Sequence, residues 1–160
     1  MDKLQLLELI KDVPFFKNFT LPEKHYLATT DSQVIRYHSN EHIINEGDME
    51  CALYIILKGE VGVTKNVIPL DGAKKNRKTL LTKLVPGAVF GEVSLISKRS
   101  RTTSIHALGE VIVLRMDGKM METLEPKFMN KLQAKLIDLL IQRLDTVNNQ
   151  LSDLIQWQKS

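Results

Sequence analysis

The spacing of hydrophobic positions changes twice along the chain and divides it into three parts. The first part has apolar residues at roughly helical spacing, interrupted at Val13-Pro14, where proline ends a helix. From Gln33 apolar and polar residues alternate with a period of two, which is typical of β-strands. After Asp117-Gly118 the helical period returns. We therefore expect N-terminal helices over residues 1–32, a β-region over residues 33–117 and C-terminal helices over residues 118–160.

The middle part consists of short apolar strands separated by turn residues. The strongest strand runs from Ala52 to Leu57, and turns are indicated at Asn45–Asp48, Asp71-Gly72 and Pro86-Gly87. Further strands are expected at Val34–His38, from Ile43, at Val61–Val67, Thr102–Leu108 and Val111–Arg115. Short strands at regular spacing with glycine turns predict a mainly β fold with flanking helices, built as a double-stranded β-helix or jelly-roll barrel.

The last part predicts a short helix over Lys119–Leu124 and one long helix from Phe128 to about Gln156. Apolar residues of the long helix form two stripes, and the longer stripe steps by three and four residues, as in a short coiled-coil seam: Ile137, Leu140, Leu144, Val147, Leu151 and Leu154. This stripe could pack within the chain, but its length favours a homodimer through the C-terminal helix. Trp157 could pack in the seam or against a partner.

Composition narrows the class of protein. The 160 residues are 43% hydrophobic and 26% charged, which suits one globular domain with an added helix. A net charge of +3 is too small to predict DNA binding. The single cysteine, Cys51, excludes a disulfide framework, and no apolar run approaches the roughly 20 residues that span a bilayer. Without a signal peptide at the N-terminus, a cytoplasmic protein that binds no membrane is expected.

The stretch with the clearest chemistry is Phe90–Leu95, which is followed by Arg101-Thr102-Thr103. Gly91 allows a close backbone approach, and Leu95 can anchor a short helical turn whose first N–H groups suit an anion. Arg101 presents a fork of donors that fits phosphate oxygens. Glu92 would repel a phosphate but can accept a hydrogen bond from a sugar hydroxyl. Together these residues predict a site for a sugar phosphate.

These motifs resemble the cyclic-nucleotide-binding domain of bacterial catabolite activators, kinase regulatory subunits and cyclic-nucleotide-gated channels. Arg101 follows Glu92 by nine residues, as in that family's phosphate-binding cassette. The resemblance covers about residues 4–155 and also rests on Val13-Pro14-Phe15-Phe16, Glu46-Gly47-Asp48, Leu53-Tyr54-Ile55-Ile56, Gly59 and Pro86-Gly87. The chain departs from the family where Ser94 replaces a frequent alanine and Ser100 a frequent proline, but neither change removes a ligand-binding group.

The resemblance implies a role for each matched residue. Gly91 and Ser94 would offer backbone N–H groups, Glu92 would bind the ribose 2′-hydroxyl, Arg101 would pair with the cyclic phosphate, and Thr102 would add a donor. Val63, Leu81 and Thr82 would line the wall around the purine, and the C-terminal helix would act as a lid. The full set of expected binding residues is Phe90, Gly91, Glu92, Val93, Ser94, Arg101, Thr102, Thr103, Val63, Leu81 and Thr82.

The function implied is that of a regulatory module without catalytic activity. It would bind cAMP or cGMP as a ligand, use no other cofactor and no metal, and signal to an effector protein, whose identity the sequence does not give, by movement of the C-terminal helix. Because the sequence ends at Ser160, we expect a stand-alone module without a helix-turn-helix, kinase or channel domain. Thr102 does not distinguish cAMP from cGMP.

Two alternatives remain at this point. His38, His42 and Glu46 are four residues apart and suggest a cupin-like metal-binding enzyme, but the His-x-His pair of cupins is missing and surface histidines are a simpler interpretation. A structural dimer with a vestigial pocket is the other alternative. Arg99 is a second candidate arginine at the wrong offset from Glu92, and Lys74–Lys78 is expected in a solvated hairpin loop.

Overall fold

The computed structural model describes residues 2–30, 32–68 and 77–158. Its backbone forms two compact units, Met1–Thr123 and Leu124–Ser160. The predicted turn at Asp71-Gly72 lies outside the described residues.

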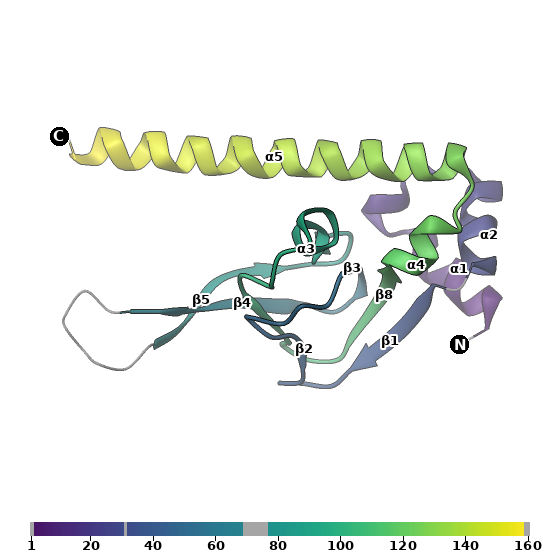
Figure 1. Cartoon of the computed structure of the whole chain (residues 1–160), viewed down its shortest axis with the longest axis horizontal. Coiled ribbons are helices and arrows are strands. Elements are labelled where there is room, and N and C mark those ends of the chain that lie inside the picture. The colour runs from purple at the N-terminus through teal and green to yellow at the C-terminus, as the bar shows by residue number, and fades with distance from the viewer. Residues whose placement is uncertain (1, 31, 69–76, 159–160) are drawn as a thin grey trace. The chain divides into compact units, whose positions relative to one another are not determined.

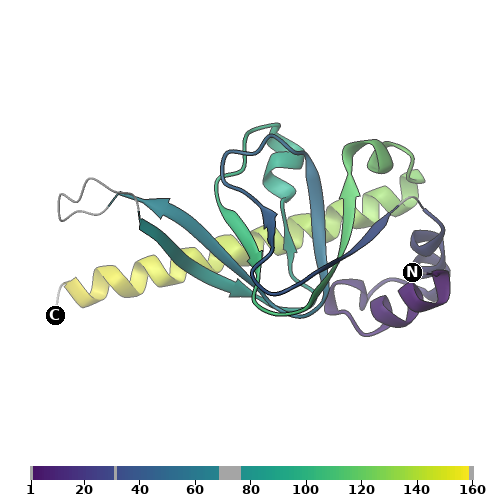
Figure 2. The ribbon, with the colours of Figure 1, turned by 90° about the horizontal axis from the view of Figure 1, so that it is seen from below.

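Two short helices and a 3-10 turn form the N-terminal part, and the views in Figures 1 and 2 place them together at one end of the sheets. Thr20 begins the second helix with a reciprocal cap, because its Oγ1 accepts from Glu23 N (3.3 Å) while Glu23 Oε2 accepts from Thr20 N (2.7 Å). The rings of Phe15, Phe16 and Phe19 pack together with centroids 4.9–6.1 Å apart. The three elements are α1 (Lys3–Lys11), η1 (Pro14–Phe16) and α2 (Leu21–Thr29).

Eight strands form two antiparallel four-stranded sheets. The first sheet has the order β1-β8-β3-β6 and the second has the order β2-β7-β4-β5. The strands are β1 (Gln33–Tyr37), β2 (His42–Ile44), β3 (Ala52–Lys58), β4 (Val61–Val67), β5 (Arg77–Leu84), β6 (Val89–Phe90), β7 (Ser104–Ala107) and β8 (Val111–Asp117). The predicted mainly β fold with flanking helices is confirmed.

Both sheets contribute to one hydrophobic core. Side chains from β3, β6 and β8 in one sheet and from β2, β4 and β7 in the other belong to a single buried cluster, as expected for two sheets that face each other. The two sheets have the layout of a jelly roll, but the strand pairings of the described residues do not join them into a closed barrel.

Several strand boundaries differ from the prediction by one or two residues, and two of the differences follow from long-range pairing. Strand β7 begins at Ser104 and not at Thr102, because the backbone of Arg101 bonds to the turn at Gly47 and Asp48 and pairing with β4 starts only at Ser104. Arg77 and Lys78, which we expected in a loop, belong to β5 and pair with β4, because the ladder between these strands extends to Val67↔Arg77. The other residues of the predicted basic loop lie outside the described part of the chain.

Two helices follow the last strand. Asp117 caps α4 (Gly118–Glu122), since its Oδ1 accepts from Met120 N at 3.0 Å. The second unit contains α5 (Pro126–Gln158), which begins with proline at a position that tolerates the missing N–H. Leu144, Leu151 and Trp157 of α5 are 59%, 54% and 86% exposed. In the part of the chain that the structure describes, no helix has the length and hydrophobicity needed to cross a membrane.

Candidate functional site

The predicted cassette forms a sharp connection between β6 and α3 (Glu92–Ser97), which lies against β3 (Figure 1). Gly91 makes this connection with φ +82°, a left-handed conformation that favours glycine. A Cβ atom at Gly91 would lie 2.5 Å from the carbonyl oxygen of Ala52 and 2.8 Å from Nη1 of Arg101. Glycine is therefore required here both by backbone conformation and by the space that the arginine occupies.

Arg101 is the most unusual side chain of the site. It is only 4% exposed, and its guanidinium donates from Nη1 to Gly91 O (2.6 Å) and from Nη2 to Ala52 O (2.8 Å). Its Nε is buried and has no hydrogen-bond partner. Among the described residues no carboxylate forms an ion pair with Arg101. A buried cation held only by carbonyl groups is costly, and an anionic ligand would offset that cost.

The backbone of Arg101 is fixed by a turn distant in sequence. Gly47 N donates to Arg101 O and Arg101 N donates to Asp48 O, both at 2.8 Å. Beside this turn, Glu46 N donates to Ser104 Oγ at 2.9 Å. The sequence indicated a turn at these positions, but the hydrogen bonds between this turn and Arg101 are seen only in the structure. The contact of Arg101 with Ala52 could not be predicted either, because it uses a backbone carbonyl group, which every residue has.

The structure brings Gly91, Glu92, Ser94 and Arg101 together at the cassette. Glu92 and Ser94 lie in α3 and are 5% and 4% exposed, so both polar groups are held inside the protein. Val93, between them, is 52% exposed and points away from the interior. A buried acid and a buried arginine close to one glycine fit the chemistry of a ligand that carries both a hydroxyl group and an anion.

The remaining predicted residues lie around the cassette or on the second sheet. Phe90 is buried and its ring stacks on Tyr54, with centroids 5.0 Å apart. Thr102 is exposed and Thr103 is partly buried, in the bend before β7. The three residues expected around a purine lie on the other sheet, where Val63 pairs with Thr82, while Leu81 is the extra residue of a bulge and is 51% exposed. Their role in a purine wall stays a prediction.

The residues of the metal hypothesis have other partners. The ring of His42 faces His106 with centroids 6.1 Å apart, and its Nε2 lies 2.9 Å from Lys78 Nζ. The Glu46 carboxylate accepts from Asn66 N at 3.0 Å. Within residues 2–30, 32–68 and 77–158, no three His, Cys, Asp or Glu side chains are grouped as a metal ion would need.

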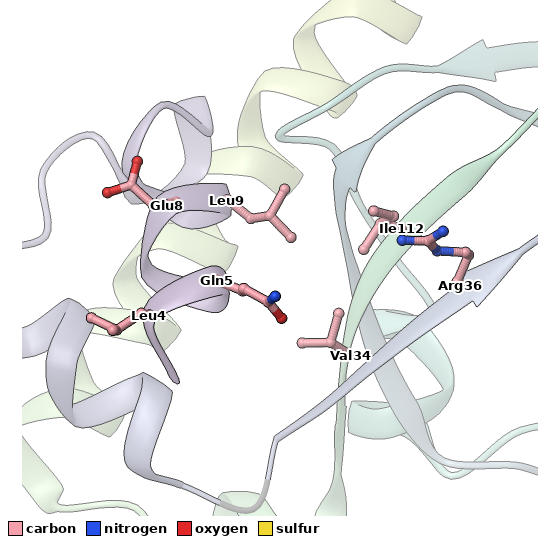
Figure 3. Close-up of a pocket in the computed structure, with 7 residues that line it drawn as sticks. All are labelled: Leu4, Gln5, Glu8, Leu9, Val34, Arg36 and Ile112. Atoms are coloured by element: carbon pink, nitrogen blue, oxygen red, sulfur yellow. The ribbon is translucent and has the colours of Figure 1, made fainter. Parts of the chain in front are cut away.

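A separate groove of about 730 Å³ lies between α1 and strands β1 and β8 (Figure 3). Apolar side chains make up most of its wall, and its polar members are exposed: Leu4, Gln5, Glu8, Leu9, Val34, Arg36 and Ile112. None of these seven residues is both polar and buried, unlike Arg101 in the cassette.

Comparison with known proteins supports the resemblance. The sequence model of the cyclic nucleotide-binding domain matches residues 34–125. A cAMP-dependent protein kinase regulatory subunit of Debaryomyces hansenii is 34% identical over 111 residues, which are 69% of this chain and 22% of that protein. The chain thus spans about a fifth of that relative.

Solved structures agree in fold. A cyclic nucleotide-binding domain from Methylobacillus flagellatus superposes with a TM-score of 0.74 and 26% identity, over 92% of this chain and 81% of that one. The regulatory subunit of a cAMP-independent protein kinase A from Trypanosoma brucei has a TM-score of 0.67 at 19% identity, over 88% and 46% of the two chains. With the cassette geometry and a family match over more than half of its length, this chain belongs to the cyclic nucleotide-binding domain family.

Proposed function

We propose that the domain binds a cyclic nucleotide, cAMP or cGMP, as a non-catalytic regulatory module. In this proposal Arg101 pairs with the cyclic phosphate, Glu92 accepts a hydrogen bond from the ribose 2′-hydroxyl, and the N–H groups of Gly91 and Ser94 complete the phosphate contacts. Thr102 and Thr103 follow Arg101 in the sequence, and the exposed Thr102 adds a hydroxyl donor.

One observation carries the proposal: the guanidinium of Arg101 is buried with its Nε free of any partner. A phosphate could accept from Nε and from one terminal nitrogen together, which is the bidentate geometry that arginine prefers. Neither alternative from the sequence explains such an arginine. A metal-binding enzyme does not need a buried cation in its site, and a vestigial pocket would leave the burial of the charge uncompensated.

Thermal unfolding with and without nucleotide tests the proposal. Ligand at about 100 times its Kd should stabilise the folded protein by about 2.7 kcal/mol. For a domain of this size the Tm should rise by several degrees. Calorimetric titration with cAMP, cGMP and guanosine then identifies the preferred ligand, with the nucleoside as a control that lacks the cyclic phosphate.

Arg101→Ala should abolish the nucleotide-dependent rise in Tm. The Tm of the free protein should change little, because loss of a buried unpaired charge offsets the loss of two hydrogen bonds. Arg99→Ala is the matched control, since Arg99 is an exposed arginine two residues away and should leave binding unchanged. If neither nucleotide shifts the Tm of the unaltered protein, the proposal is wrong, and the domain has the fold of the family but does not bind cyclic nucleotides.

Signalling is the second part of the proposal. A ligand switches a protein only if it binds one conformation better than another. The 33 residues of α5 form the longest element of the chain, and we assign the output to movement of this helix toward an effector protein. We assign its exposed apolar stripe to pairing with a second copy of the chain.

A further inference from the structure

A cluster of charged side chains lies at the ends of β1, β3 and β8, outside the cassette. Arg115 on β8 donates from Nε (3.1 Å) and Nη2 (2.6 Å) to Oε1 of Glu50, and from Nη1 to Oδ2 of Asp117 and Oε1 of Gln33, both at 3.1 Å. The Arg115 side chain is only 17% exposed. The Glu50 side chain is 44% exposed, so only the arginine end of this ion pair is shielded, and the two hydrogen bonds to Oε1 give the pair its defined geometry.

Tyr54 connects this cluster to the cassette. Its hydroxyl donates to Oε2 of Glu50 at 3.1 Å, and its ring stacks on Phe90 with an interplanar angle of 4°. The edge of the same ring lies 3.2 Å from where a Cβ of Gly91 would be. Burial, and then the charge of Glu50, raises the pKa of Tyr54 to about 12, so the hydroxyl stays a donor. One rigid ring therefore touches both the cassette and Glu50.

The backbone makes a second connection. Glu50 precedes by two residues the carbonyl group of Ala52, which accepts the hydrogen bond from Nη2 of Arg101. At the other end of the cluster, Asp117 contacts Arg115 through Oδ2 and caps α4 through Oδ1, at Met120 N. The cluster thus joins the segment that holds the buried arginine to the first turn of α4.

We propose that Glu50 is a positioning residue for the nucleotide site and that Arg115 and Asp117 couple this site to the N-terminus of α4. The inference rests on the proposed function, since it requires Arg101 to hold the phosphate. Glu50 fixes the segment whose carbonyl orients the guanidinium. In a variant that lacks the Glu50 charge, this segment is not held in place in the free protein. Ligand binding must then order the segment, and the free-energy cost of this ordering lowers the affinity.

Glu50→Gln tests the inference, with Glu110→Gln as the matched control. Glu110 is as exposed as Glu50 (46% against 44% of the side chain), but its contacts to Arg36 (3.7 Å) and Lys58 (3.9 Å) are longer and involve exposed cations. Glu110 also precedes β8 at the end opposite to Arg115. In calorimetric titrations with cAMP and cGMP, Glu50→Gln should bind about fivefold more weakly, as an indirect coupling of modest size predicts. Glu110→Gln should bind like the unaltered protein.

Amide hydrogen exchange measures the coupling itself. Saturating nucleotide should change the exchange rate of the Met120 amide, which Asp117 caps, and Glu50→Gln should abolish that change. A purely structural role of Glu50 would alter exchange equally with and without nucleotide. Tyr54→Phe, which keeps the ring stack and the Glu50–Arg115 pair, is a milder second variant that should weaken binding about twofold.

The outcomes separate the two proposals. If the unaltered protein binds neither nucleotide, the proposed function is wrong and this inference falls with it. If Arg101→Ala loses binding while Glu50→Gln keeps full affinity, only the inference is overturned. An unchanged response of the Met120 amide in Glu50→Gln would also overturn it.

Discussion

Gly91 and Arg101 depend on each other at the scale of single residues. The space that a larger residue at position 91 would need is occupied by the arginine and by the carbonyl group of Ala52. The buried guanidinium in turn finds an acceptor in the carbonyl group of Gly91 because the left-handed turn directs that group inward. A side chain at position 91 should therefore displace the arginine.

We predict that Gly91→Ala destabilises the free protein and weakens nucleotide binding. A left-handed backbone costs a non-glycine residue about 1–2 kcal/mol, and the contact with the Ala52 oxygen adds to that cost. Gly109→Ala is the control, because nothing lies within 4 Å of its Cβ position. Denaturant unfolding and titration of both variants check this prediction, and equal stability of the two variants would contradict it.

His106 should make stability depend on pH. Burial lowers the pKa of His106 below 6.5, and the charges of Lys78 and His42 lower it further. Its Nδ1 is buried without a partner. The unfolded chain therefore binds a proton more readily, and the free energy of unfolding should fall as pH drops from about 6.5 through the folded pKa.

Urea unfolding between about pH 7 and pH 5 measures this slope, and His106→Asn should reduce it. His38→Asn is the control, since His38 is an exposed histidine. An identical slope in His106→Asn and the unaltered protein would exclude His106 as its source.

Most helices and strands could be predicted from the sequence, because they depend on local patterns of residues. The strand from Ala52, the turn into α3 and the long helix α5 all follow from spacing and glycine. The start of β7 was not predictable in this way, since it depends on hydrogen bonds between Arg101 and a turn more than fifty residues earlier. Long-range pairing leaves no local signal in one sequence.

Thr20→Ala should destabilise the domain by about 1 kcal/mol, because it removes the acceptor of the reciprocal cap at the start of α2. The Tm should fall by a few degrees, while the nucleotide Kd should not change, because Thr20 belongs to an exposed helix start. Thr146→Ala serves as the control, since the Thr146 hydroxyl bonds only to Gln142 O within α5. A loss of nucleotide affinity in Thr20→Ala would contradict this assignment.

For the whole molecule, the sequence predicted the family and the cassette but not how the cassette is supported. Gly91, Glu92 and Arg101 carry a motif with fixed spacing, so their proximity could be expected. Glu50 and Arg115 are 65 residues apart and belong to no motif. Their contact results from the pairing of β3 with β8, which only the structure shows. Absence of DNA binding, cytoplasmic location and the lid role of α5 stay predictions.

The exposed stripe of α5 predicts concentration-dependent dimerisation. Leu144 and Leu151 are both more than half exposed, and pairing with a second helix would bury them. Leu144→Asp should shift the protein to monomer in light scattering coupled to gel filtration. Asn149→Asp places the same charge on a polar position of the same helix and should leave the oligomeric state unchanged. A monomeric unaltered protein at high concentration would exclude the dimer.

Trp157 is the single tryptophan of the sequence and lies 86% exposed near the end of α5. Excitation that is selective for indole therefore reports on one end of one helix and on no other part of the chain. The emission of an isolated chain should be that of a hydrated indole, and contact with a second helix should move it to shorter wavelengths. The protein thus contains its own optical probe, and a dilution series or a nucleotide titration can follow α5 without any added label.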